Sequence, residues 1–140
     1  MKILRFNDPL TKIPRTGILK DGNVLCEGKD FGPFASLEIL APCEPTKVIA
    51  AAINYHGATD WEEGMTEPLF FLKAPSSVCA PSAAIVSPFS DVSCWGEAEL
   101  AIVVGKTAKN VSVSGARNFI LGFTVANDVS CDNLGKRDHH

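Results

Sequence analysis

Two glutamates spaced two positions apart form the strongest chemical signal in this sequence of 140 residues. Glu97 and Glu99 begin the stretch 97–104, in which one set of alternating positions is wholly apolar, a pattern that predicts a β-strand. Side chains two positions apart in a strand share a face and lie about 7 Å apart along the backbone. Two such carboxylates suit a solvated strand face, which is the commoner case, or a shared Mg²⁺, Mn²⁺ or Ca²⁺ ion.

Three further residues are candidates for the same chemistry. Asp128 lies in a strand expected over 123–130 and would supply a third ligand if that strand neighboured the first, which periodicity alone does not fix. His56 is a candidate base, since histidine titrates near neutrality. Lys73 could add positive charge beside a bound acid. The ordinary alternatives are a loop histidine and an exposed lysine at a strand end.

The composition excludes several classes of function. The chain has 13 basic and 16 acidic residues, a formal net charge of −3 and 46% hydrophobic residues. This balance argues against a nucleic-acid-binding protein, which would carry a basic patch. No apolar run reaches the ~18 residues of a membrane helix, and the charged start differs from a signal peptide, so we expect a cytoplasmic protein with no membrane partner. The five cysteines contain no CxxC pair and are expected to be free thiols.

The elements that must position these residues are mainly strands. Eleven glycines and nine prolines separate short apolar runs, so we expect a mixed, mainly β (α+β) fold. A small N-terminal β unit and linker should occupy residues 1–45, with a hairpin turn at Asp21-Gly22, and a second part should occupy 46–140. In that part the apolar face of strand 97–104 should point to the core. The other expected elements are strands at 47–53, 69–73, 84–86 and 123–130 and short helices near 58–64 and 114–120.

Several motifs, in order, resemble the fumarylacetoacetate hydrolase family, and together they cover roughly residues 3–134. The N-terminal motifs are Thr16-Gly17-Ile18-Leu19 with Asp21-Gly22, and Leu40-Ala41-Pro42 followed by Lys47-Val48-Ile49 and Asn54-Tyr55. The later motifs are Glu67-Pro68-Leu69-Phe70-Phe71-Leu72-Lys73, Gly96-Glu97-Ala98-Glu99-Leu100, and the segment from Gly122 to Ser130 that contains Asn127-Asp128-Val129.

The resemblance implies a fumarylacetoacetate hydrolase-like β-roll, with residues 46–140 as the metal-binding part of the catalytic roll. It implies that Glu97, Glu99 and Asp128 hold Mg²⁺ or Mn²⁺. The implied substrate is a small 2-oxo or 2,4-dioxo acid, which would undergo C–C bond hydrolysis, decarboxylation or isomerisation through a metal-stabilised enolate. A homodimer is also implied.

The sequence departs from the family pattern in three places. Ala58 and Trp61 stand where many members carry a His–Glu dyad that activates water, which leaves His56 as the nearby histidine. After Asp128, Cys131-Asp132-Asn133 stand where Ala-Arg-Asp is common in the family, which removes an arginine that could clamp a substrate carboxylate. Family members also continue well beyond the position that residue 140 occupies. The alternatives to a 2-oxo acid enzyme are therefore a catalytically impaired metal-binding or interaction module and a half-enzyme that needs another chain.

Overall fold

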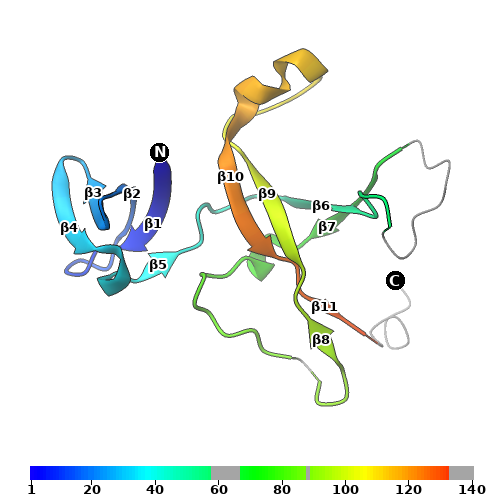
Figure 1. Ribbon diagram of the computed structural model, residues 1–140, viewed down its shortest axis with the longest axis horizontal. Coiled ribbons are helices and arrows are strands. Elements are labelled where there is room, and N and C mark those ends of the chain that lie inside the picture. The colour runs from blue at the N-terminus through cyan, green and yellow to red at the C-terminus, as the bar shows by residue number, and fades with distance from the viewer. Residues whose placement is uncertain (58–66, 88, 133–140) are drawn as a thin grey trace. The chain divides into compact units, whose positions relative to one another are not determined.

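The computed structural model describes residues 1–57, 67–87 and 89–132, and most of its regular structure is β-strand (Figure 1). This confirms the expected mainly β fold. Two compact units are present, Met1–Ala83 and Ala84–His140; the domain boundary expected after residue 45 stays a prediction. The helix expected near 58–64 lies outside the described residues, and the one near 114–120 is a 3-10 helix, Val113–Phe119. Shorter 3-10 turns occur at Phe34–Ser36 and Pro75–Ser77.

The first unit begins with a five-stranded antiparallel sheet in the order β4-β3-β2-β1-β5. Its strands are β1 (Lys2–Asn7), β2 (Pro14–Lys20), β3 (Asn23–Cys26), β4 (Lys29–Pro33) and β5 (Ile39–Leu40). Asp21 and Gly22 join β2 to β3 with φ angles of 50° and 87°. Positive φ at both turn positions is the property for which Asp-Gly is selected, so the predicted hairpin is confirmed.

The core of the described residues lies in this sheet. It consists of buried Leu4, Phe6, Val24 and Cys26, against which Leu19, Phe31, Leu37 and Ile39 pack. A Cβ at Gly17 of β2 would lie 2.9 Å from the Leu25 carbonyl oxygen and 2.9 Å from Val24 Cγ1. Contacts this short are not tolerated in a packed interior, so the close approach of β2 to the core requires glycine at position 17.

Asp8 orders the connection between β1 and β2. Its Oδ1 accepts hydrogen bonds from the backbone N–H groups of Leu10 (3.0 Å) and Thr11 (3.2 Å). Its Oδ2 accepts one from Arg15 Nε at 2.7 Å. The Leu10 and Arg15 hydrogen bonds favour the ionised carboxylate and lower the pKa of Asp8 from 3.8 to about 2. The connection therefore depends on a charged Asp8.

A hairpin-like pair, β6 (Val48–Ala52) and β7 (Leu69–Lys73), completes the strands of the first unit. The two strands are antiparallel, with Val48 opposite Lys73 and Ala52 opposite Leu69. They confirm the strands expected at 47–53 and 69–73. The strand expected at 84–86 is wrong, because that apolar run has no ladder partner among the described residues.

The second unit contains a long antiparallel ribbon (Figure 1). Strand β9 (Ala98–Val104) pairs with β10 (Ile120–Asn127), and β8 (Cys94–Trp95) pairs with β11 (Ser130–Cys131). The strands expected at 97–104 and 123–130 are thus present and adjacent. The same register relates both pairs, so β8–β9 and β10–β11 are two continuous sides of one ribbon.

The apolar face of β9 does not enter a core in this structure. Leu100 and Ile102 are 70% and 56% exposed, and Val104 is exposed as well. The described part of the second unit contains no buried hydrophobic side chain. The expectation that this face points to a core is therefore not met within the described residues, because a two-stranded ribbon has no second layer to cover its apolar face.

The described residues also contain no helix with the length and apolarity to span a membrane.

Candidate functional site

The ribbon places the three predicted metal ligands at neighbouring positions. Glu99 of β9 lies opposite Ala126 of β10. Beyond the strand ends the pairing continues, because the Asp128 N–H donates to the Glu97 carbonyl oxygen at 2.9 Å. Directly paired residues of an antiparallel ladder share a face, as do residues two apart in one strand. This register assigns positions 97, 99 and 128 to one face at one end of the ribbon.

The donor chemistry at these positions fits a hard divalent cation, which prefers carboxylate oxygens. Glu97 is half-buried, Glu99 is exposed, and the Glu97 Oε1 accepts a hydrogen bond from Trp95 Nε1 at 3.1 Å. Within residues 1–57, 67–87 and 89–132, no three His, Cys, Asp or Glu side chains gather closely enough to hold a metal. The Trp95 hydrogen bond uses one oxygen of the Glu97 carboxylate and leaves the other available to a cation, and the ligand set stays a prediction.

Asn127 fixes the backbone beside the first glutamate. Its Oδ1 accepts a hydrogen bond from the Glu97 N–H at 3.0 Å. A Cβ at Gly96 would lie 2.7 Å from that same oxygen, so the absence of a side chain at position 96 makes room for Asn127. Sequence reasoning missed this positioning residue and put position 127 only on the face away from Asp128. The available signal was the glycine directly before Glu97.

Cys94 and Cys131 form a disulfide, with their Cα atoms 4.1 Å apart. The expectation of five free thiols is therefore wrong. The bond forms because the two residues lie directly opposite each other in the β8–β11 pair. A cysteine count carries no information about strand register, so the sequence alone did not indicate this pairing. The free thiols are buried Cys26, half-buried Cys43 and exposed Cys79.

The two predicted catalytic residues lie in the first unit. His56 is exposed in the turn that follows β6, beyond its Ala52 end. Lys73 is the half-buried last residue of β7, opposite Val48. Val48 and Ala52 are four residues apart, or roughly 13 Å in a strand, so His56 and Lys73 lie at opposite ends of this hairpin. Ala58 and Trp61 fall outside the described residues, and the catalytic roles of His56 and Lys73 stay predictions.

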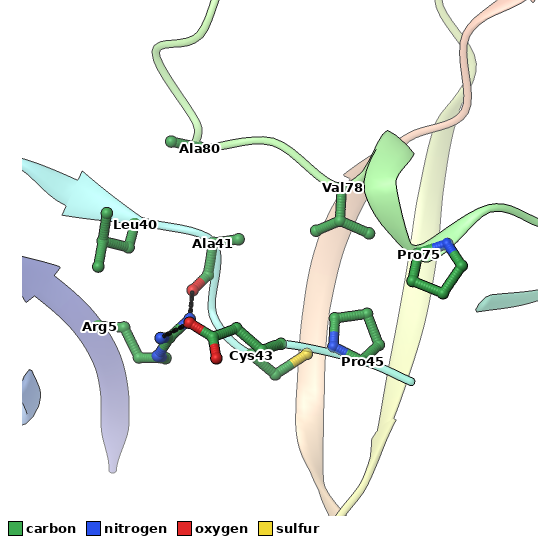
Figure 2. Close-up of a pocket in the computed structure, with 9 residues that line it drawn as sticks. Arg5, Leu40, Ala41, Cys43, Pro45, Pro75, Val78 and Ala80 are labelled. Atoms are coloured by element: carbon green, nitrogen blue, oxygen red, sulfur yellow. Dashed lines mark hydrogen bonds and ion pairs between the residues drawn. The ribbon is translucent and has the colours of Figure 1, made fainter. Parts of the chain in front are cut away.

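An open groove of about 310 Å³ also lies in the first unit, and Figure 2 shows its lining. The Arg5 guanidinium donates to the Ala41 carbonyl oxygen at 3.2 Å and forms an ion pair with Glu44. Because Glu44 already compensates this positive charge, Arg5 is a poor clamp for an acidic substrate. The remaining lining residues are Leu40, Cys43, Pro45, Pro75, Val78 and Ala80. None of the predicted site residues lines the groove.

Comparison with known proteins identifies the chain's relatives. A family model described as fumarylacetoacetate (FAA) hydrolase C-terminal matches residues 47–139. A Dictyostelium discoideum fumarylacetoacetate hydrolase domain-containing protein 2 homolog is 40% identical over 101 residues, which cover 70% of this chain and 33% of that protein. The mitochondrial oxaloacetate tautomerase FAHD2B of Homo sapiens is 36% identical over 110 residues, or 76% of this chain and 35% of the human protein.

Solved structures with a similar fold point to the same group of proteins. The 5-carboxymethyl-2-hydroxymuconate delta-isomerase of Mycobacterium smegmatis superposes with a TM-score of 0.78 at 29% identity, covering 100% of this chain and 59% of that chain. For the 2-hydroxyhepta-2,4-diene-1,7-dioate isomerase of Mycobacterium marinum, the TM-score is 0.77 at 28% identity, with coverage of 100% and 58%. The chain spans about a third to a half of the length of the curated relatives it matches. Because the family model matches most of the length of this chain, and because the relatives above match it as well, the chain belongs to the fumarylacetoacetate hydrolase family.

Proposed function

We propose that this chain is the metal-binding part of a divalent-metal-dependent enzyme acting on small 2-oxo or 2,4-dioxo acids. The observation that supports it most is the ribbon register, which aligns position 128 with 97 and position 126 with 99. The relatives add support, because they include an oxaloacetate tautomerase, a 5-carboxymethyl-2-hydroxymuconate delta-isomerase and a 2-hydroxyhepta-2,4-diene-1,7-dioate isomerase.

Glu97, Glu99 and Asp128 are the proposed ligands, and Mg²⁺ or Mn²⁺ is the proposed ion. Three carboxylates suit these hard cations and leave other coordination positions for water or substrate oxygens. A bound divalent ion would act as a Lewis acid towards the carboxylate and 2-oxo oxygens of the substrate. Asn127 holds the backbone N–H of Glu97 and so helps to orient this ligand.

Among the reaction branches, we favour tautomerisation or isomerisation. Such a reaction moves a proton between carbon and oxygen, or between two carbons, and consumes no water. It does not need the water-activating dyad whose usual positions hold Ala58 and Trp61 in this sequence. Lys73 would contribute positive charge towards the substrate acid in this branch.

Hydrolysis is the second candidate. It is favoured by the family-model match and by the likeness to a fumarylacetoacetate hydrolase of Exiguobacterium antarcticum, with a TM-score of 0.75 at 25% identity. This branch requires a base that deprotonates water, and His56 is the proposed residue. The exposed position of His56 after β6 leaves it accessible to solvent water.

One experiment separates the branches. The purified chain is assayed with Mn²⁺ for enol–keto conversion of oxaloacetate and, separately, for cleavage of an acylpyruvate. We expect the first reaction to be accelerated, Glu99→Ala to abolish it, and His56→Ala to change it little. If hydrolysis is the reaction, His56→Ala should instead lower turnover by about 10²–10⁴-fold. No acceleration of either reaction would contradict the proposed enzyme and favour an impaired metal-binding or interaction module.

We further propose that the enzyme is a cytoplasmic homodimer. The described pairs β6–β7 and β9–β10 are two-stranded sheets, and their outer edges pair with no other described strand. Unpaired edges are commonly covered by another strand or chain. Light scattering at micromolar concentration should give twice the chain mass. A monomer would contradict the dimer, and native mass spectrometry that finds a different bound polypeptide would identify a half-enzyme.

A further inference from the structure

The Cys94–Cys131 disulfide closes the end of the ribbon next to the candidate ligands. It links β8 and β11, a pair in which only two residue pairs are in register, Ser130 with Trp95 and Cys131 with Cys94. One more connection follows: the Asp132 N–H donates to the Ser93 carbonyl oxygen at 2.9 Å, and the Ser93 N–H donates to Asp132 Oδ1 at 2.9 Å. Few hydrogen bonds therefore hold this end together without the covalent bond.

The disulfide is in register with the positions of the proposed ligands. Cys94 precedes Glu97 by three residues, and Cys131 follows Asp128 by three, a separation of roughly 10 Å along each strand. The pairing between these two points has a single register, continued by the Asp128 N–H to Glu97 carbonyl hydrogen bond. A slip or separation at the cysteines would consequently displace Asp128 relative to Glu97.

Packing supplies little else to hold the ribbon in place. The described residues of the second unit include no buried hydrophobic side chain, and Trp95, the neighbour of Cys94, is 49% exposed. Regions with few buried apolar contacts open locally at low free-energy cost. A covalent cross-link therefore contributes a larger share of local order here than it would in a packed core.

We propose that Cys94 and Cys131 form a reversible dithiol–disulfide site that sets how firmly the strand ends bearing Glu97 and Asp128 are held together. Its regulatory consequence, tighter metal binding in the disulfide form, rests on the proposed function. The holding of the strand ends does not depend on that function.

The redox step is a two-electron exchange with a dithiol reductant. The exposed position of Cys94 makes its sulfur the accessible one, and Cys131 is half-buried. A thiolate of the reductant attacks Cys94 Sγ, the Cys94–Cys131 bond breaks, and Cys131 leaves as a thiolate that takes up a proton. The second thiolate of the reductant then attacks the reductant sulfur that is bonded to Cys94 in the mixed disulfide, and Cys94 leaves as a thiolate that takes up a proton. The cysteines gain two electrons and two protons, and the reductant becomes a disulfide; oxidised glutathione drives the reverse reaction.

The first test counts thiols by mass spectrometry after maleimide labelling in denaturant. The oxidised chain should take up label at the three free cysteines, Cys26, Cys43 and Cys79. After treatment with dithiothreitol all five cysteines should be labelled, and oxidised glutathione should restore the first pattern. Five labelled cysteines under every condition would overturn the proposal.

The second test measures hydrogen–deuterium exchange of the full chain in both redox states. Reduction should accelerate exchange in peptides spanning 93–99 and 126–132 by about tenfold, because local opening controls exchange. Cys94→Ser should match the reduced protein without added reductant. The control Cys79→Ser, which removes an exposed free thiol, should leave exchange in these peptides unchanged. Equal exchange in the oxidised and reduced proteins would overturn the proposal.

Titration of Mn²⁺ into each redox form separates this inference from the proposed function. We expect the disulfide form to bind about tenfold more tightly, in the range found when groups that orient metal ligands are lost. Equal affinity in both forms would overturn the regulatory consequence. Failure of the oxidised form to bind Mn²⁺ would contradict the proposed function. The hydrogen–deuterium exchange measurement would still test whether the disulfide holds the strand ends together.

Discussion

Replacement of Asn127 by alanine should weaken metal binding through an effect on Glu97. The substitution removes the acceptor of the 3.0 Å hydrogen bond from the Glu97 N–H. Asn127 is exposed, so water can replace its oxygen, and the cost in unfolding free energy should not exceed the ~0.5–1.5 kcal/mol of an ordinary hydrogen bond. The effect on the site should be more specific, because the backbone that carries a proposed ligand loses its anchor.

For Mn²⁺ affinity we expect a loss of about tenfold, the lower end of the range seen when a group that orients a metal ligand is removed. Such a loss corresponds to ~1.4 kcal/mol of binding free energy. Isothermal titration calorimetry at constant pH measures it directly. Asn127→Asp retains an acceptor oxygen and should keep more of the affinity than Asn127→Ala.

The matched control is Asn23→Ala in the first unit. Asn23 Nδ2 donates to Asp30 Oδ2 at 2.8 Å, so this variant also loses one asparagine hydrogen bond, but far along the sequence from the ligands. It should bind Mn²⁺ like the wild type. Unchanged affinity in Asn127→Ala, or an equal loss in Asn23→Ala, would refute the positioning role.

Three more substitutions test the structure. Gly96→Ala places a Cβ 2.7 Å from Asn127 Oδ1 and should weaken Mn²⁺ binding about as much as Asn127→Ala; wild-type affinity would contradict this. Gly17→Ala should lower the free energy of unfolding in urea by about 1–3 kcal/mol through overpacking against Val24, and an unchanged midpoint would count against that contact. The folded-state pKa of Asp8 lies below its ordinary 3.8, at about 2, so its stabilising contribution is present above pH 3.8 and is lost as the pH falls towards 2. Asp8→Asn should therefore flatten acid unfolding over that interval, and an unaltered pH profile would exclude Asp8 as the cause.

Local sequence patterns predicted the elements whose signals lie within the element itself. The Asp21-Gly22 turn is specified by the tolerance of two residues for positive φ. The alternation in 97–104 and 123–130 gave strands close to β9 and β10. These signals need no knowledge of a distant partner.

Features that depend on pairing between distant segments were not predictable in the same way. The adjacency of Asp128 to Glu97 follows from the β9–β10 register, which periodicity left open. The Cys94–Cys131 bond follows from the same register, and the run at 84–86 shows that apolar residues alone do not supply a strand partner. The role of Asn127 lies in a side-chain contact across the ribbon, which strand alternation does not describe.

The most direct test of the metal site is Mn²⁺ binding followed by electron paramagnetic resonance, in which bound Mn²⁺ loses the sharp signal of the free ion. The wild-type chain is compared with Glu99→Gln, which removes one carboxylate without changing side-chain size, and with Glu38→Gln, the same change at an exposed position in the first unit. We expect the wild type and Glu38→Gln to bind Mn²⁺ equally and Glu99→Gln to bind at least about tenfold more weakly. A wild-type chain that leaves the free-ion signal unchanged, or a Glu99→Gln chain that binds as tightly as the wild type, would contradict the assignment of Glu97, Glu99 and Asp128 as a metal site.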